Sequence, residues 1–549
     1  MNSQPITFHH APKSTSLQLR DNSIVLCTLN ARYIHSSLGL RYLYANMGSL
    51  QSATRIVEFV ISQRTNDIAE RLLELDPEII GFGVYIWNIE QTTALISLIK
   101  NIKPEIKIVI GGPEVSYEYI DTNIYHLCDH LITGQADLAF SQVCNQLLQT
   151  AAPPKVIDAQ VPDINQLELP YSFYNSEDIA YRVMYVEASR GCPFKCEFCL
   201  SALDKTAKSF ELEQFLYEME QLYNRGTRRF KFVDRTFNLK LSHCTRILQF
   251  FLDRINDDRS LFLHFEVIPD KLPDALKHLI QQFPEGSLQF EIGIQSFNPQ
   301  VQQTINRRQN IEKTVQNIEW LRKHSNAHIH ADLIFGLPGE TLESFADGFN
   351  QLAKLEPHEI QLGLLKRLRG SPIVERSNQY AMRFENVAPY QLLQNSTVDF
   401  ATMQRVQRFA RYWDLIANSG RFKFTLPLLL GDDPFDRFMR LSDWVYKFSQ
   451  QTHKINYQRL LGLVHRGATE IGLCAVEPMY DALAADSFAN GYKHPPEWIS
   501  KRQQPPMKER IVELEPNDSS ADEKSSIPAR QKRHLSRNSQ QLPAQADST

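Results

Sequence analysis

The chain lacks the features that define several large classes of protein. Its 549 residues contain no uninterrupted apolar run of about 18 residues, the length that a membrane-spanning helix needs. The opening stretch MNSQPITFHHAPKSTSLQLR holds no continuous apolar segment, so no secretory signal is expected. Neither sign of charge is in excess, because the net charge is −4. This balance disfavours a broad nucleic-acid surface, and a long nucleic acid is not an expected partner.

Cysteine is also scarce, with eight residues in the whole chain. Five of them are scattered, which is typical of buried free thiols in a reducing compartment: Cys27, Cys128, Cys144, Cys244 and Cys474. A cytoplasmic protein is therefore expected. The other three, Cys192, Cys196 and Cys199, lie together in RGCPFKCEFCLS, residues 190–201.

The first part of the chain alternates between strand-like and helix-like stretches. Strands are predicted at 23–30, 54–62, 78–88 and 106–116. Strands that alternate with helices form a parallel sheet through right-handed crossovers. We therefore predict a doubly wound, Rossmann-like α/β domain over 22–150, whose ligand site lies at the carboxyl ends of its strands. The segment 151–180, rich in proline and polar residues, is predicted to be a linker.

A second alternating series follows, with strand candidates at 183–189, 228–237, 261–268, 287–296, 328–339 and 359–368. Six strands are fewer than the eight of a closed barrel, so we predict a partial (β/α)6 TIM barrel over 181–372. A mainly helical region is predicted over 373–495. The Gln-, Ser-, Pro- and charge-rich stretch 496–549 is predicted to be a disordered tail.

Three clustered cysteines pose a question of coordination, because structural zinc and electron-transfer iron–sulfur sites usually use four thiolates. Zinc would need a fourth ligand, and the neighbouring sequence offers no further Cys or His. Chance clustering is the other alternative. A cubane cluster held by three thiolates instead leaves one iron open to a small molecule. The three cysteines are predicted to lie in the loop after the first barrel strand, on the catalytic face.

The spacing Cys-x3-Cys-x2-Cys, with Phe198 before the last cysteine, resembles the radical S-adenosylmethionine (SAM) superfamily. The resemblance implies a [4Fe-4S] cluster held by Cys192, Cys196 and Cys199, with SAM bound to the open iron and Phe198 beside it. It also implies reductive cleavage of SAM to a 5′-deoxyadenosyl radical. The electron would come from a donor such as flavodoxin or ferredoxin.

Downstream segments resemble the same superfamily. VDRTFN, with Asp234 and Asn238, is similar to a stretch near a strand end in members that carry a cobalamin domain; a capped strand-to-helix turn is the alternative. FEIGIQSFN is similar to the fourth-strand stretch whose polar residues contact SAM. Glu291 and Gln295 share one face of that strand, and buried structural hydrogen bonding is the alternative to a cofactor contact.

Two glycine-containing stretches carry further resemblance. ADLIFGLPGET is similar to the fifth-strand motif, in which Gly336 and Gly339 would let the backbone approach the adenine; a plain turn is the alternative. LNARYIHSSLGLRYL, GFGVYIWN and GGPEVSYE resemble the cobalamin-binding domain that precedes many radical SAM cores. There Gly111 and Gly112 could admit a nucleotide tail between strand ends.

His35 departs from the pattern of that domain. Many cobalamin domains bind cobalt through the histidine of an Asp-x-His-x-x-Gly motif, whereas here the aspartate is missing and Gly39 stands one place late. A metal-bound histidine normally has a partner that fixes its tautomer. His35 is therefore expected to be a loop or helix-start histidine. A domain that binds no cobalamin and only recognises substrate, or packs against the barrel, remains an alternative.

These resemblances imply a cobalamin-dependent radical SAM enzyme that methylates or otherwise modifies an unactivated carbon. A methylthiotransferase is an alternative, but that class needs a second cluster on three N-terminal cysteines, and Cys27, Cys128 and Cys144 are widely separated. A non-catalytic redox or binding protein would need a fourth thiolate at the cluster. The helical extension resembles the DUF4080 type, and it could cover a small-molecule, lipid or peptide substrate.

Overall fold

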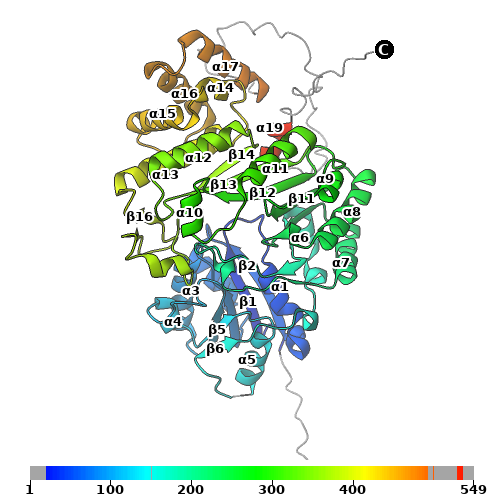
Figure 1. Cartoon of the computed structure of the whole chain (residues 1–549). Coiled ribbons are helices and arrows are strands. Elements are labelled where there is room, and N and C mark those ends of the chain that lie inside the picture. Colours follow the sequence, from blue (N-terminus) through cyan, green and yellow to red (C-terminus); the bar gives the residue numbers. More distant parts are fainter. Residues whose placement is uncertain (1–19, 150, 492–498, 500–527, 536–549) are drawn as a thin grey trace, which may run out of the picture.

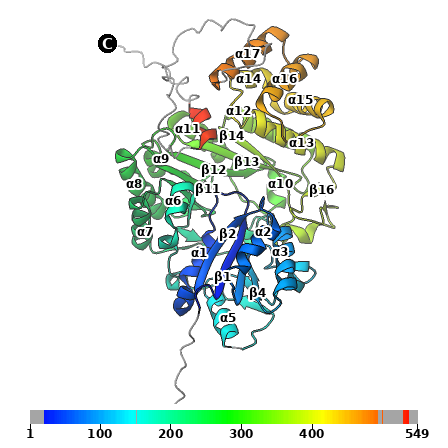
Figure 2. The same ribbon diagram turned by 180° about the vertical axis from the view of Figure 1, so that it is seen from behind.

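Two parallel sheets organise the chain, one in each α/β unit (Figure 1). The computed structural model describes residues 20–149, 151–491, 499 and 528–535. Among these residues, no helix is long and apolar enough to cross a membrane. The first sheet and its helices lie on one side of the barrel, and the later helices pack on another side, as both views show (Figure 2).

The N-terminal sheet has the order β2-β1-β3-β4-β5-β6, and every pair is parallel. Its strands are β1 (Ile24–Asn30), β2 (Thr54–Val60), β3 (Ile79–Gly83), β4 (Lys107–Gly111), β5 (His130–Gly134) and β6 (Val156–Ala159). Helices α1 (Leu38–Ala45), α2 (Thr65–Leu73), α3 (Ile89–Ile102), α4 (Asn123–Leu127) and α5 (Ala139–Leu148) connect them. Strand β1, which has a neighbour on both sides, is wholly apolar except for Thr28 and Asn30, so it is buried along its length.

The doubly wound, Rossmann-like architecture predicted for this part is confirmed. Two strands were not predicted, β5 and β6. The segment 151–180 was predicted to be a linker, yet β6 within it pairs with β5 as the sixth strand of the sheet. Its sequence VIDA is short and flanked by prolines, so it carries little strand signal.

The second sheet has the order β14-β13-β12-β11-β10-β7, again with every pair parallel. Its strands are β7 (Met184–Val186), β10 (Arg229–Phe232), β11 (Phe262–Val267), β12 (Leu288–Gln295), β13 (His328–Phe335) and β14 (Glu359–Leu364). The helices are α6 (Ser176–Tyr181), α7 (Leu212–Asn224), α8 (Leu241–Asp257), α9 (Asp274–Ile280), α10 (Pro299–Thr304), α11 (Ile311–His324) and α12 (Leu342–Lys354). The predicted partial (β/α)6 barrel is confirmed.

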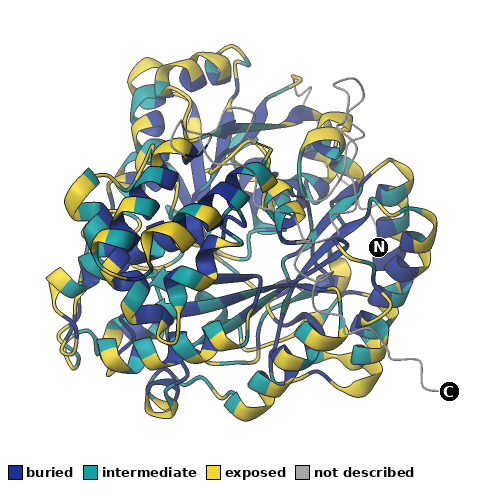
Figure 3. Cartoon of the chain, turned by 90° about the horizontal axis from the view of Figure 1, so that it is seen from above, coloured by how far each residue is buried: buried dark blue, intermediate teal, exposed yellow. Residues whose placement is uncertain are grey.

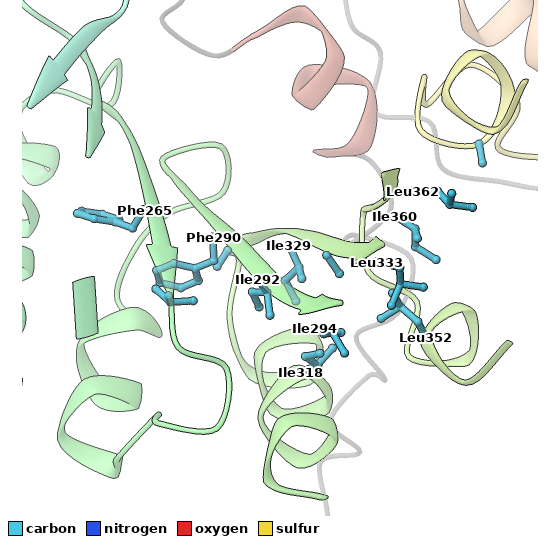
Figure 4. Packing of buried hydrophobic residues seen from close by; sticks show 14 of the residues in the cluster. Phe265, Phe290, Ile292, Ile294, Ile318, Ile329, Leu333, Leu352, Ile360 and Leu362 are labelled. Atoms are coloured by element: carbon cyan, nitrogen blue, oxygen red, sulfur yellow. The ribbon is translucent and has the colours of Figure 1, made fainter. Parts of the chain in front are cut away.

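The barrel strands bury their apolar alternates against the outer helices. Ile292 and Ile294 of β12 point toward Ile318 of α11, and Leu333 and Ile360 point toward Leu352 of α12 (Figure 4). Seen from above, the buried strands lie inside a shell of helices whose outer faces are exposed (Figure 3). Because successive strand residues point to opposite sides, the other alternates face the barrel interior.

The region after the barrel is mainly helical, as predicted. It contains α13 (Phe400–Ile416), α14 (Thr425–Leu430), α15 (Pro434–Ser449), α16 (Tyr457–Glu470) and α17 (Val476–Ala489), with a small hairpin of β15 (Arg383–Phe384) and β16 (Leu392–Gln394) before them. Aromatic packing joins it to the barrel, because Phe349 of α12 lies 4.8 Å from the ring of Trp413 and 5.6 Å from that of Phe435.

Helix α19 (Ala529–Leu535) corrects the prediction of a disordered tail over 496–549. For residues 529–535 that prediction is wrong, because Gln531 and His534 are buried against the barrel. The composition of the stretch hides the helix, since five of its seven residues are polar or charged. Most of the remaining tail lies outside the described residues.

Candidate active site

The cysteine loop leaves the barrel directly after β7 and is closed by a small hairpin of β8 (Ser189–Arg190) and β9 (Lys208–Ser209). Gly191 begins the loop at φ +93°, and a Cβ there would lie 2.2 Å from the carbonyl oxygen of Thr206. Only glycine fits this close approach without strain. The chain turn therefore places Cys192 and the following cysteines beneath the carboxyl ends of the barrel strands.

All three cysteines line one cavity of about 290 Å³. Cys192 and Cys196 are 8% and 7% exposed, and burial raises the pKa of both thiols. Among the described residues, no three His, Cys, Asp or Glu side chains converge as a single metal ion would require. A four-iron cluster instead takes each thiolate on a different iron atom, so three thiols around one cavity, with Cys192 and Cys196 buried and Cys199 half-buried, fit such a cluster.

The carboxyl ends of β11, β12 and β13 form the wall of the same cavity. Phe198, Glu291 and Gln295 line it, so three of the predicted cofactor-binding residues are brought together with the cysteines. Gln295 has φ +73°, at a register shift between β12 and β13. Its buried Oε1 has no hydrogen-bond partner among the described residues. An unsatisfied buried acceptor is costly unless a ligand supplies the donor, which favours a polar ligand at this position.

Glu291 lies between a histidine and a lysine. His264 Nε2 is 2.9 Å from its Oε2, and Lys231 Nζ is 3.6 Å from the same oxygen. Burial opposes ionisation of Glu291, but the hydrogen bond from His264 and the charge of Lys231 outweigh it and hold its pKa well below the usual range. The cavity wall therefore carries a fixed negative charge.

Asp234 and Asn238 lie outside the wall of this cavity. Asp234 is 2% exposed and accepts hydrogen bonds from the Ala188 amide at 2.9 Å and the Ser189 hydroxyl at 2.5 Å. Asn238 accepts from the Ile268 amide at 2.7 Å and donates to the Ile268 carbonyl at 2.9 Å. Both residues thus hold the backbone that enters the cysteine loop or leaves β11.

Gly336 and Gly339 also lie away from the lining of the cysteine cavity. Their φ values are +91° and +81°, which glycine adopts readily. A Cβ on Gly336 would lie 2.6 Å from the Leu392 side chain, and its carbonyl accepts a hydrogen bond from Asn395 at 3.0 Å. Their contact with a cofactor stays a prediction.

Arg307 is a residue that the sequence analysis missed. Its Nη1 lies 3.5 Å from the Sγ of Cys196, its Nη2 donates to the Gly293 carbonyl, and its Nε donates to Gln309 at 2.8 Å. The guanidinium opposes the effect of burial on the Cys196 thiol. The one signal in the sequence is the pair Arg307-Arg308 shortly after the fourth barrel strand; both residues line the cavity.

A second cavity of about 390 Å³ lies at the carboxyl edge of the N-terminal sheet. Gly111 and Gly112 line it, as predicted for the ligand edge of this domain. Gly112 has φ +118°, and a Cβ there would lie 2.4 Å from the Val84 carbonyl oxygen. The same cavity is lined by three more glycines on the neighbouring strands, Gly81, Gly83 and Gly134. Because glycine has no side chain, a ligand that spans several strands can approach the backbone directly.

His35 lies in the loop between β1 and α1, where its Nδ1 is 2.6 Å from the hydroxyl of Tyr185 on β7. It therefore contacts the barrel, in agreement with the expectation of a loop histidine. The cysteines of the methylthiotransferase alternative are dispersed. Cys27 and Cys128 belong to the core on one face of the sheet and Cys144 to the core on the other.

Comparison with known proteins defines the class. The family described as "B12 binding domain" matches residues 24–144, "Radical SAM superfamily" matches 186–352, and "Protein of unknown function (DUF4080)" matches 378–542. The chain is thus a radical SAM protein with an N-terminal B12-binding domain. More specifically, the chain also carries a DUF4080 region after the radical SAM domain. These domains imply a [4Fe-4S] cluster, SAM and cobalamin as cofactors.

Individual relatives are distant. An uncharacterized methyltransferase, PH0819 of Pyrococcus horikoshii, is 24% identical over 56% of this chain and 70% of its own length. The cobalamin-dependent radical SAM methyltransferase TokK of Streptomyces tokunonensis is 23% identical over 56% of this chain, and the match spans only 50% of TokK. The structure of the cobalamin-dependent SAM radical enzyme OxsB matches with TM-score 0.60 at 13% identity, over 87% of this chain and 82% of OxsB. This likeness shows the shared fold.

Proposed function

We propose that the chain is a cobalamin-dependent radical SAM enzyme that transfers a methyl group to a carbon of its substrate. One observation carries the proposal: the two cavities border the same short segment. Glu187 and Arg190 line the glycine-rich cavity, and Cys192, two residues on, lines the other. Two cofactor sites at adjoining cavities are what a reaction shared between two cofactors needs.

The two sheets direct their carboxyl ends toward each other, which supports the proposal. Arg190, after β7, contacts Asp137, which follows the carboxyl end of β5, at 3.0 Å. Arg369, after β14, contacts Glu114, which follows β4, at 2.9 Å. Ligand sites of parallel α/β units lie at these ends, so ligands of the two domains would meet between them.

In this proposal Cys192, Cys196 and Cys199 hold the cluster, while Gln295 offers its free acceptor to SAM. Arg307 beside Cys196 places a positive charge where a carboxylate could bind. Three apolar side chains lie just after strands of the N-terminal sheet and are more than 40% exposed: Ile34 after β1, Trp87 after β3 and Tyr117 after β4. Their exposure fits a bound cobalamin whose flat ring lies over the carboxyl edge of this sheet. When bound, the cofactors supply a methyl group and a carbon-centred radical.

The relatives support methyl transfer, because PH0819 and TokK are both named methyltransferases. The substrate is proposed only as a molecule small enough to enter between the domains, such as a small metabolite, a lipid or a peptide. An external donor such as flavodoxin or ferredoxin would supply the electron.

Product analysis tests the proposal. The anaerobically reconstituted enzyme is incubated with SAM, hydroxocobalamin and a chemical reductant, and both 5′-deoxyadenosine and S-adenosylhomocysteine are expected. Cys196→Ala should lose 5′-deoxyadenosine, whereas Cys474→Ala, which lies between α16 and α17, should retain both products. If only 5′-deoxyadenosine forms, the N-terminal domain recognises substrate and the methyl transfer assigned here is wrong.

A further inference from the structure

The interior of the barrel is lined by ionisable and polar side chains. Closed eight-stranded barrels are filled by layers of branched apolar residues. Here the inward alternates of β10 to β14 include Lys231, His264, Glu266, Gln289, Glu291, His328, His330, Asp332, Glu359 and Gln361. Their apolar neighbours pack outward on α11 and α12 (Figure 4). Such an interior is costly unless the groups pair with one another.

Four of these residues form a continuous series. His328 Nε2 lies 3.1 Å from Glu359 Oε1, and Glu359 Oε2 lies 3.9 Å from His330 Nδ1. His330 Nε2 lies 3.3 Å from Asp332 Oδ1. Asp332 lines the cysteine cavity, so the series runs from the amino ends of β13 and β14 to that cavity. The 3.9 Å interval is within reach of one bridging water or a small rotation of the imidazole.

Its charges alternate along the series. Burial opposes the charged form of His330, but Asp332, Glu359 and Glu291 outweigh it and raise its pKa to about 9. Burial raises the pKa of Asp332, while His330 opposes that rise; Glu291 raises it further and Lys231 lowers it. For Glu359 burial is outweighed by His328, Arg530 and His330, which lower its pKa to about 2.

The polar side chains of β10, β11 and β12 next to this series contact one another. Glu291 pairs with His264 and Lys231, and burial lowers the pKa of His264, so that histidine is neutral. Gln361 accepts from His330 Nε2 at 3.0 Å and fixes the ring. The imidazole of His330 is thus held between a carboxylate on the cavity side and a carboxylate on the inner side.

Helix α19 lies next to the barrel strands (Figure 1) and contacts the inner end of the series. Arg530 contacts Glu359 at 2.9 Å and Asp414 at 2.7 Å. Gln531 donates to Gln289, and the ring of His534 lies 5.4 Å from that of His328. This helix, separated from α17 by about forty residues of sequence, therefore forms the floor of the barrel.

We propose that Asp332 is an acid–base residue of the cysteine cavity and that His330, whose charged form Glu359 stabilises, reloads its proton. Asp332 gives its proton to a ligand in the cavity, and the Nε2–H of His330 then gives its proton to the Asp332 carboxylate. The neutral imidazole keeps its Nδ1 proton toward Glu359, which stays ionised, so each proton lost by one group is gained by the next and no electron is transferred. Exchange of hydrogen for methyl by hydrogen-atom transfer alone needs no acid or base. A relay at this cavity therefore implies that the reaction includes a proton transfer in addition to the hydrogen-atom transfer.

Proton release on SAM binding tests this inference, which rests on the proposed function only in that the cavity must accept SAM. Calorimetric titrations of the reconstituted enzyme with SAM at pH 8.5, in buffers of different ionisation enthalpy, give the number of protons released. If the sulfonium cation lowers the pKa of His330 by about one unit, roughly half a proton is displaced from it. Any proton released by SAM itself is common to all variants.

Matched variants separate a relay from a structural network. His330→Gln and Glu359→Gln should each lose that half proton. Asp414→Asn, which breaks the contact of Arg530 on α19 with α13, and His264→Gln should release as much as wild type. SAM binding with unchanged release in His330→Gln and Glu359→Gln would overturn the relay. If Glu359→Gln and Asp414→Asn lost proton release equally, Glu359 would act only by anchoring α19 through Arg530, and the relay would be wrong. Failure of the wild type to bind SAM would instead contradict the proposed function.

Discussion

The guanidinium of Arg190 lies 3.0 Å from the carboxylate of Asp137 and joins the cysteine loop to the N-terminal domain. A second carboxylate, Glu187, lies 2.6 Å from the same side chain. The side chains of Arg190 and Asp137 are only 16% and 10% exposed. Because one cation neutralises two nearly buried carboxylates, its loss would leave charge uncompensated at the border of both cavities.

Arg190→Ala is therefore expected to be strongly destabilising. Breaking a buried ion pair by removing one partner costs about 3–5 kcal/mol. A urea-unfolding experiment at neutral pH measures the loss, and the variant should also retain less iron and less cobalamin after desalting. Arg405→Ala is the control, because its pair with Asp443 has side chains 41% and 36% exposed. Such a surface pair contributes about 1 kcal/mol or less, and equal losses in both variants would contradict the account.

Gly112→Ala is expected to impair the glycine-lined cavity. Its φ of +118° and the 2.4 Å approach to Val84 leave no room for a methyl group. Strain of this kind costs on the order of 1–3 kcal/mol, and the retained cobalamin should fall. Gly462→Ala provides the comparison, since that helical glycine has open space around it. There alanine should raise stability by about 0.5–1 kcal/mol. If Gly112→Ala retained as much cobalamin as wild type, the glycine-lined cavity at the carboxyl edge of the N-terminal sheet would not be the cobalamin site.

Asp234 should make stability depend on pH. Burial raises its pKa to about 7, although hydrogen bonds from Ser189 and Ala188 oppose the shift. The folded state then binds a proton that the unfolded chain has released, so the stabilisation is complete below about pH 4 and is lost as pH rises toward 7. Relative to Asp234→Asn, wild type should lose on the order of 2–4 kcal/mol between these limits. Urea unfolding across this range measures it; a constant difference would show that Asp234 does not titrate there.

His35→Ala should leave the absorption spectrum of any bound cobalamin unchanged. The Nδ1 of His35 is engaged by Tyr185 at 2.6 Å, and burial lowers its pKa. Tyr185→Phe removes the same hydrogen bond while keeping the histidine, so both variants should lose a similar, small amount of stability. A spectral change in His35→Ala that is absent from Tyr185→Phe would identify His35 as a cobalt ligand.

The sequence predicted all six strands of the barrel sheet and four of the six strands of the N-terminal sheet, because their apolar runs and intervening helices have clear periods. The cysteine spacing likewise singled out three residues that line one cavity, because their closeness in one loop needs no tertiary information. Asp234 and Asn238 show the limit of such local patterns. Their motif is present, but the hydrogen bonds that decide their role reach residues 30 or more positions away.

The barrel interior could have been predicted in part. Stretches such as FLHFEV and HIHADLIF alternate polar with apolar residues, whereas strands buried on both faces usually read as continuous apolar runs. What the sequence could not supply was the partner of each polar residue, which depends on strand register. Helix α19 was missed for a similar reason: Gln531 and His534 are polar, and their burial depends on contacts with β12 and β13.

Cofactor retention tests the central claim most directly. Wild type and the Cys192→Ala/Cys196→Ala/Cys199→Ala variant would be reconstituted anaerobically with iron, sulfide and hydroxocobalamin, desalted, and compared by optical absorption. The account predicts that both retain cobalamin, while the iron–sulfur absorbance is lost only in the variant. Cobalamin that washes away from a wild-type protein still holding its cluster would contradict the two-cofactor site.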